Sequence, residues 1–214
     1  MAEEIGKAEA AAVFGKLKAI MEKNREELTR LDAALGDGDL GMVMAKAFAH
    51  IGEKTAAIQE QAADPGKMFA LAGMEIGKNA PSTMGTLLAS GFMKAGKAVS
   101  GKPAIGAADM AVFIKAFADA IAALGGASQG DKTVLDVLYP AAQAAEGAAR
   151  EGLGLGDVLA KAAAGAQKGL EEGRGLMARH GRPGIFREKT IGMTDPGSFA
   201  GVLIIRAFCE ALSQ

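Results

Sequence analysis

Residues 13–41 read VFGKLKAIMEKNREELTRLDAALGDGDLG, and the interpretation of the whole chain starts from this stretch. Its apolar residues recur at helical spacing and would share one face: Val13, Leu17, Ile20, Leu28 and Leu31. The pattern stops at Gly36-Asp-Gly-Asp39, where glycine frees the backbone from helical geometry. The stretch therefore predicts a long amphipathic helix that ends in an acidic, glycine-rich loop.

The rest of the composition favours helices as well. Half of the 214 residues are apolar, and Ala, Leu, Met and Ile dominate them, with no Trp and one Tyr. Ala, Leu and Met are strong helix formers, whereas the β-branched and aromatic residues typical of strands are few. Most of the 30 glycines fall between apolar runs, where they act as caps and turns. We expect an all-α protein.

The spacing of apolar residues and the positions of Gly, Pro and helix-capping residues divide the chain into eight helical segments in one domain over residues 1–214. They cover about residues 2–33, 41–59, 65–79, 82–99, 107–124, 131–151, 157–179 and 196–212. Asp131 is expected to cap the sixth and Pro140 to bend it. Short connections favour an antiparallel up-and-down bundle or closed barrel. The loops after the first, third and fifth helices and before the eighth would then share one end.

Several function classes are disfavoured by composition. The net charge is −1 with both signs interspersed, so no basic stripe for nucleic acid is present. No apolar run reaches the roughly 18 residues of a membrane span, and residues 1–18 are too charged for a signal peptide. Cys209 is the only cysteine, which excludes an internal disulfide. We expect a cytoplasmic protein.

Asp32, Asp37 and Asp39 are the candidate metal ligands. Three carboxylates within eight residues, separated by glycines, form a hard oxygen cluster that suits Mg²⁺, and no Lys or Arg lies between them. The residues alone leave a second interpretation open, because Asp-Gly pairs are common in turns and Asp39 could simply cap the next helix.

Other site motifs are absent from the sequence. Residues 40–46 lack the bidentate Glu of an EF-hand, and no Walker loop or dinucleotide-binding glycine motif occurs. Zinc does not fit one Cys and two distant histidines, His50 and His180, which we interpret as surface or boundary residues.

Three motifs together resemble the nucleotide-binding L subunit of dihydroxyacetone kinases. They are Asp32 with Leu35-Gly-Asp-Gly-Asp-Leu-Gly41, Gly130-Asp-Lys-Thr-Val-Leu-Asp136, and Gly181-Arg182 followed by Asp195-Pro-Gly197. Their order and spacing match over essentially the whole chain. The resemblance implies an eight-helix antiparallel barrel that holds an Mg²⁺–nucleotide complex at one end.

The resemblance also implies roles for individual residues. Asp32, Asp37 and Asp39 would hold two Mg²⁺ ions that bridge the phosphates of ATP or ADP. The other expected nucleotide contacts are Leu40, Gly41, Met42, Val43, Ser82, Thr83, Gly125, Arg182, Asp195, Pro196 and Gly197. Asp131, Lys132 and Thr133 are expected only to cap and orient the sixth helix.

Two positions depart from the family pattern. The family usually has His where this chain has Leu40, and a Gly-Gly-x-Ser-Gly turn where this chain reads Gly77-Lys-Asn-Ala-Pro-Ser-Thr-Met-Gly85. Ser82 and Thr83 could supply the hydroxyl and N–H groups of that turn. These departures indicate a divergent branch and leave the three aspartates intact.

The function implied by the resemblance is that of a phosphoryl-donor subunit. It would act only with a K-type substrate-binding subunit, and a phosphotransferase-system phosphocarrier or a homodimer is compatible with it. Catalysis would rest on positioning and charge neutralisation, with no catalytic nucleophile on this chain. Two alternatives stay open: a regulatory or adaptor protein that holds Mg-ADP without turnover, and a lipid or acyl carrier with an apolar interior lined by some of the 11 Met residues.

Overall fold

Nine α-helices make up most of the computed structural model, which describes residues 3–212. In chain order they are α1 (Lys7–Lys23), α2 (Arg25–Leu35), α3 (Leu40–Gln61), α4 (Pro65–Asn79), α5 (Thr83–Ala98), α6 (Ala107–Gly125), α7 (Leu135–Arg150), α8 (Leu155–Gly173) and α9 (Pro196–Leu212). Two short 3₁₀ turns, η1 (Pro183–Ile185) and η2 (Arg187–Thr190), precede α9. The all-α prediction is confirmed, and β pairing in the described residues is limited to one bridge between Ile5 and Ile105.

The predicted helices correspond to the observed ones with three differences. The expected first helix is divided at Asn24 into α1 and α2, and its expected start at Ala2 lies outside the described residues. The sixth begins at Leu135 instead of 131, and the seventh ends at Gly173 instead of 179. Residues 183–185 and 187–190 form the two 3₁₀ turns.

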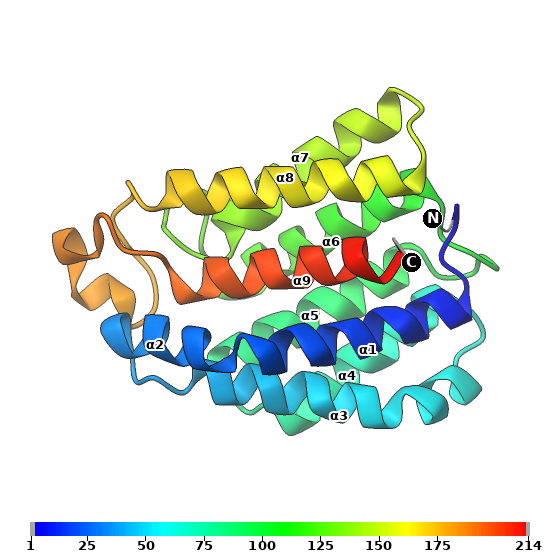
Figure 1. The fold of residues 1–214 in the computed structure, drawn as a ribbon, viewed down its shortest axis with the longest axis horizontal. Helices are drawn as coiled ribbons and strands as arrows, with labels where there is room; N and C mark the ends of the chain where they lie inside the picture. Colours follow the sequence, from blue (N-terminus) through cyan, green and yellow to red (C-terminus); the bar gives the residue numbers. More distant parts are fainter. Residues whose placement is uncertain (1–2, 213–214) are drawn as a thin grey trace.

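The helices close into a ring. Each helix from α3 to α9 packs against the next along the chain, and α9 also packs against α1, which contacts α3. Figure 1 shows α8, α9, α1 and α3 side by side along the length of the barrel. The end of α2 and the two 3₁₀ turns lie at one end, whereas the start of α1 and the end of α9 lie at the other (Figure 1). The expected antiparallel barrel is therefore confirmed.

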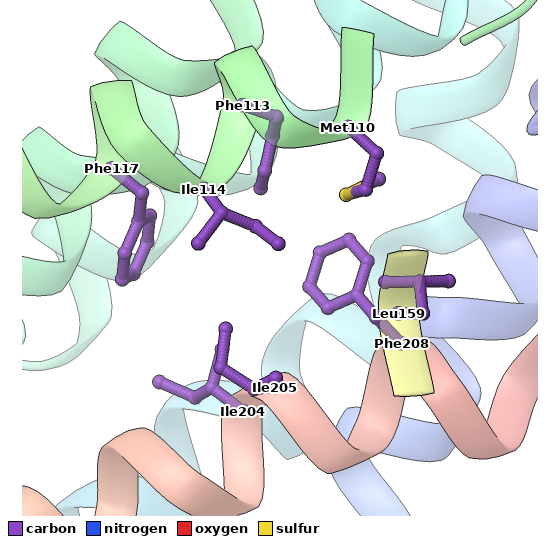
Figure 2. A pocket seen from close by; sticks show the side chains of 8 residues that line it. All are labelled: Met110, Phe113, Ile114, Phe117, Leu159, Ile204, Ile205 and Phe208. Atoms are coloured by element: carbon purple, nitrogen blue, oxygen red, sulfur yellow. The ribbon is translucent and has the colours of Figure 1, made fainter. Parts of the chain in front are cut away.

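Aromatic rings fill the axis of the barrel. Phe69 contacts Phe14 edge-on at 5.6 Å, Phe113 at 4.9 Å and Phe208 in a stack at 5.4 Å between ring centroids. Phe92 and Phe117 continue the cluster at 5.0 Å. The cavity between α6, α8 and α9, shown in Figure 2, has a volume of only about 10 Å³. That volume has room for about one water molecule and none for an acyl chain.

Close backbone packing joins α7 to α8. Pro140 lies inside α7 and has no N–H to donate to the carbonyl oxygen of Asp136. That oxygen lies against Gly169, where an added Cβ would come within 2.2 Å of it. The two helices therefore fix the connection before α7, which lines a cleft, relative to the end of α8. No helix in residues 3–212 is both long and apolar enough to cross a bilayer.

Candidate functional site

A cleft of about 480 Å³ opens at the end of the barrel where α2 ends. Four connections line it: the α2–α3 loop, the α4–α5 turn, the α6–α7 connection, and the long segment 174–195 between α8 and α9. These are the loops that alternate connections of an up-and-down barrel bring to one end.

Three carboxylates gather at one side of this cleft. Asp32 stands on the last turns of α2, and Asp37 and Asp39 follow in the loop. Their oxygens lie within 4.8 Å of one another, and no other such group of acidic, His or Cys side chains occurs in residues 3–212. Gly36 and Gly38 allow this arrangement, because a Cβ at Gly36 would lie 2.6 Å from Asp32 Oδ1 and Gly38 has a φ of +75°.

The cluster has few compensating contacts. Asp32 Oδ2 accepts the N–H of Leu40 at 3.1 Å, and Asp37 Oδ2 pairs with Arg182 Nη1 at 2.6 Å. Asp39 stands at the N-cap of α3, yet its side chain makes no capping hydrogen bond. The interpretation of Asp39 as a simple helix cap therefore does not fit this geometry.

The electrostatics of the cluster fit a hard divalent cation. Burial, followed by the negative charges of Asp37 and Asp32, raises the pKa of Asp39, and the Arg182 guanidinium opposes this. One arginine cannot balance three carboxylates. Mg²⁺ prefers carboxylate oxygens and would relieve this repulsion, so the donor set suits it.

Four helices begin at the cleft, and their first residues line it: Leu40 of α3, Thr83 of α5, Leu135 of α7 and Pro196 of α9. The first N–H groups of a helix have no acceptor within it and carry a partial positive charge. Such helix ends bind phosphate groups. The cleft therefore places a carboxylate cluster whose chemistry suits a cation beside several helix ends whose chemistry suits an anion.

Two of these helix ends have side-chain caps. Ser82 Oγ accepts the N–H of Gly85 at 3.0 Å, which fixes the register of the turn before α5. Asp195 Oδ2 accepts the N–H of Ser198 at 2.6 Å. Burial raises the pKa of Asp195 to about 6, although the bonds from Ser198 and the charge of Lys132 oppose the shift.

Most residues predicted to contact a nucleotide do line the cleft: Leu40, Ser82, Thr83, Gly125, Arg182, Asp195, Pro196 and Gly197. Gly41, Met42 and Val43 do not. Gly41 packs on α2, where a Cβ would lie 2.1 Å from the carbonyl oxygen of Arg25. The side chain of Met42 is exposed, and Val43 packs against the core.

Sequence reasoning missed the role of the α6–α7 connection. Asp131 does not cap α7; it accepts the N–H of Ser128 at 2.8 Å and contacts His180 Nε2 at 3.1 Å. Asp136, in the first turn of α7, instead fixes the loop before this helix, because its carboxylate accepts the N–H groups of Gly130 and Thr133 at 2.6 and 2.7 Å. The Gly-rich run 125–130 marks a turn, but nothing in it distinguishes Asp131 from Asp136 as the acceptor.

Lys132 and His180 also border the cleft. Lys132 is 1% exposed, and its amine donates to three backbone carbonyls at the end of α8. His50, in contrast, pairs with Glu75 through Nε2 at 2.9 Å, on the side of the barrel between α3 and α4. Because the partners of Lys132 lie more than 40 residues away in sequence, no local pattern could have indicated its burial.

The walls of the cleft are apolar on the side of α5 and α6. Met84, Leu87, Ile121 and Ala127 face the cavity from these helices and the following loop. Leu40 adds an aliphatic side chain next to the aspartates, where the resemblance would place a ring. A ligand with a flat apolar part and an anionic part would match both sides of the cleft.

Comparisons with known proteins identify a family. The DAK2 domain family matches residues 34–210. The ADP-binding subunit DhaL of PEP-dependent dihydroxyacetone kinase from Escherichia coli (strain K12) is 26% identical over 195 residues, covering 91% of this chain and 92% of that subunit. The corresponding subunit of dihydroxyacetone kinase 1 from Listeria innocua is 30% identical over 190 residues, covering 89% of each chain.

A solved structure has the same fold. The dihydroxyacetone kinase of C. freundii superposes with a TM-score of 0.72 in its native form and 0.69 in complex with AMP-PNP and Mg²⁺, at 24% identity. The alignment covers 95% of this chain but only 34% of that kinase, so this chain spans about a third of its length. At this identity the likeness establishes the fold alone.

Proposed function

Because this chain belongs to the DAK2 domain family, we propose that it is the phosphoryl-donor subunit of a two-part kinase, which holds ATP or ADP with Mg²⁺ and acts on dihydroxyacetone or a related short ketose. The observation that carries this proposal is the aspartate cluster beside the four helix N-termini in one cleft. The names of the two subunits from Escherichia coli and Listeria innocua, which specify ADP binding, support the same ligand.

Different residues of the chain would bind different parts of the nucleotide. Asp32, Asp37 and Asp39 would hold two Mg²⁺ ions, which when bound neutralise phosphate charge. The N-termini of α3, α5 and α9 would donate N–H groups to phosphate oxygens, with Ser82 and Asp195 fixing the shape of two of them. Arg182 would move its guanidinium from Asp37 toward the phosphates.

The apolar wall would hold the base. Leu87 and Ile121 would pack on its faces, and Gly125 leaves room beside Leu87, where an added Cβ would lie 3.2 Å from a Leu87 methyl group. These residues orient the nucleotide and exclude water from one side of it. Positioning together with charge neutralisation is the main contribution of the protein to phosphoryl transfer.

The acceptor of the phosphoryl group would come from a second protein. The proposed arrangement supplies sites for base, phosphate and cation, and we assign the ketose to a K-type subunit that docks at the open end of the cleft. The donor would be ATP, or ADP rephosphorylated in place by a phosphotransferase-system carrier.

The adaptor alternative uses the same cleft without turnover, whereas the carrier alternative needs interior volume. The cavity of about 10 Å³ in Figure 2, closed by Phe113, Phe117 and Phe208, argues against an acyl chain inside the barrel.

Calorimetry of ADP binding tests the ligand. We expect ADP to bind when Mg²⁺ is present at about 1 mM, a level that saturates weak carboxylate sites. When EDTA removes the Mg²⁺, no heat of ADP binding should appear. Equal affinity in both conditions would contradict the metal assignment.

A reconstitution assay separates kinase from adaptor. The chain is mixed with a K-type subunit and dihydroxyacetone, and supplied with ATP in one arm and with a phosphorylated carrier in the other. Continuous phosphorylation in either arm supports the kinase and identifies the donor. Stable nucleotide binding without product in both arms supports the adaptor.

A further inference from the structure

Lys132 is a buried cation that the proposed chemistry does not use. It lies in the α6–α7 connection, is 1% exposed and has a φ of +58°. A non-glycine residue in this left-handed region is strained, and such residues persist where the surrounding structure holds them. A strained, buried lysine beside a candidate ligand cleft calls for an explanation.

The amine of Lys132 is fully engaged by the end of α8. Nζ donates to the carbonyl oxygens of Gly173 at 2.9 Å, Arg174 at 3.2 Å and Leu176 at 3.1 Å. An ammonium has three N–H donors, and the last carbonyl oxygens of a helix have no intrahelical N–H group to accept. Lys132 therefore ends α8 and has no donor left for a ligand.

The segment 174–195 that begins at this point is attached mainly near its two ends. At one end, the carbonyl oxygen of Asp131 accepts the N–H of Arg179 at 3.1 Å. At the other, buried Thr190 Oγ1 accepts the N–H of Ala178 at 2.9 Å, and Gly192 N–H donates to the carbonyl oxygen of Arg174 at 2.7 Å. Between these ties, Arg182 reaches across the cleft to Asp37.

We propose that Lys132 is a positioning residue for the nucleotide: by holding the end of α8 against the start of α7, it sets where Arg182 stands relative to the three aspartates. The inference rests on the proposed function, in which Arg182 contacts phosphate. It differs from the earlier expectation that Lys132 only orients the following helix, because two of its three partners, Arg174 and Leu176, belong to the segment that carries Arg182.

The test is a double-mutant cycle between Lys132→Met and Arg182→Gln, measured as Mg²⁺-dependent ADP affinity by calorimetry. We expect Lys132→Met to weaken ADP binding about tenfold, within the range seen for residues that act through others. In the Arg182→Gln background the same change should cost less than about twofold, since the group that Lys132 positions is already absent.

Lys7→Met is the matched control. Lys7 Nζ also donates to a backbone carbonyl, that of Ala62 at 2.8 Å, but at the start of α1, away from the cleft. It should leave ADP affinity unchanged. Lys132→Gly is a second variant in case Lys132→Met does not fold, because glycine adopts the positive φ without strain and removes the same amine.

Limited proteolysis with trypsin monitors the segment 174–195 directly and needs no nucleotide. Trypsin can cut after Arg179, Arg187 and Lys189, and loss of the Lys132 bonds should speed these cuts at unchanged melting temperature of the barrel.

The outcomes separate the two hypotheses. If wild-type protein does not bind Mg-ADP, the proposed function fails. The trypsin experiment still tests whether Lys132 holds the segment 174–195 in place. If wild type binds but the two substitutions have additive effects, or if trypsin cuts at the wild-type rate, Lys132 is a stability residue only and the inference is overturned.

Discussion

Two groups of three aspartates border or support the same cleft, and they differ in how many backbone N–H groups their carboxylates accept. Each carboxylate of the first group accepts backbone N–H: Asp131 from Ser128, Asp136 from Gly130 and Thr133, and Asp195 from Ser198. In the second group, Asp32 accepts one N–H from Leu40. Among the contacts in residues 3–212, Asp37 and Asp39 accept none.

We interpret the first group as structural acids and, on the proposed function, the second group as acids that bind a ligand. A carboxylate that accepts N–H groups stabilises the loop around it, and its removal should cost folding free energy. Carboxylates held close together without such donors repel one another, and their removal should cost ligand affinity instead. Four predictions follow from this comparison, in order of decreasing expected effect.

The largest effect is expected for Asp39→Asn or Asp37→Asn. Mg²⁺-dependent ADP affinity should fall by more than about 100-fold. Loss of a residue that only hydrogen-bonds to a metal ligand already lowers affinity by up to about 100-fold, and these residues are proposed as the ligands themselves. Helical content by circular dichroism should not change, because neither side chain caps a helix. Asp119→Asn is the matched control, since it removes an exposed carboxylate paired with Lys115 on α6. Retained ADP affinity in the cluster variants would remove the metal assignment.

The second effect concerns the pH dependence of stability through Asp195. Burial raises the pKa of its carboxyl from 3.8 to about 6, so the unfolded state loses its proton at lower pH than the folded state. The stabilising contribution of the protonated group is complete below about pH 4 and is lost as pH rises through 6, by up to about 3 kcal/mol.

Asp195→Asn cannot titrate and gives the reference. The free energy of unfolding of wild type, minus that of Asp195→Asn, should therefore decrease between pH 4 and pH 7 in urea titrations. A difference that stays constant would show that folding does not shift this pKa, and one that increases with pH would show that the charged form is favoured in the folded protein.

The third effect is a loss of stability in Asp136→Asn. An amide in place of this buried carboxylate can present oxygen to only one of the two N–H groups, so unfolding in urea should become easier by about 2 kcal/mol. Mg²⁺ affinity of the metal cluster should be unaffected. The comparison fails if Asp39→Asn destabilises the fold as much as Asp136→Asn does.

The smallest effect is expected for Ser82→Ala. Ser82 caps α5 with a neutral hydroxyl, and its loss should lower the free energy of unfolding by about 1 kcal/mol. Ser90→Ala, inside the same helix, is the control and should change stability by less than about 0.5 kcal/mol. Equal effects of the two substitutions would mean that the cap does not stabilise the turn beside the cleft.

Much of the fold could be predicted from the periodicity of apolar residues and from residues that start or end helices. Asp64-Pro65, Ser82-Thr83 and Asp195-Pro196 signal helix starts through local chemistry, and α4, α5 and α9 begin there. The break at Asn24 was missed because the apolar stripe continues through it. There, the Asn24 side chain donates to the carbonyl oxygen of Ile20 at 2.8 Å, a contact that periodicity does not reveal.

The errors around α7 and α8 have different causes, one non-local and one local. Lys132 ends α8 from a position 41 residues earlier in the chain, and Asp136 reaches back to shape the loop before its own helix. In the cleft, the aspartate cluster could be predicted because its three residues are neighbours in sequence. The first group could be predicted only in part. Asp195 before Pro196 signals a helix start, whereas the sequence does not show which backbone N–H groups Asp131 and Asp136 accept.

The phenylalanine cluster along the barrel axis has a consequence for compression. Hydrostatic pressure unfolds proteins largely by eliminating internal voids, and the volume change scales with those voids. The cavity of about 10 Å³ between α6, α8 and α9 offers almost none to eliminate. The barrel should therefore keep its packing at pressures that unfold helical proteins with a hollow interior, and Phe113→Ala, by opening that axis, should make it compressible.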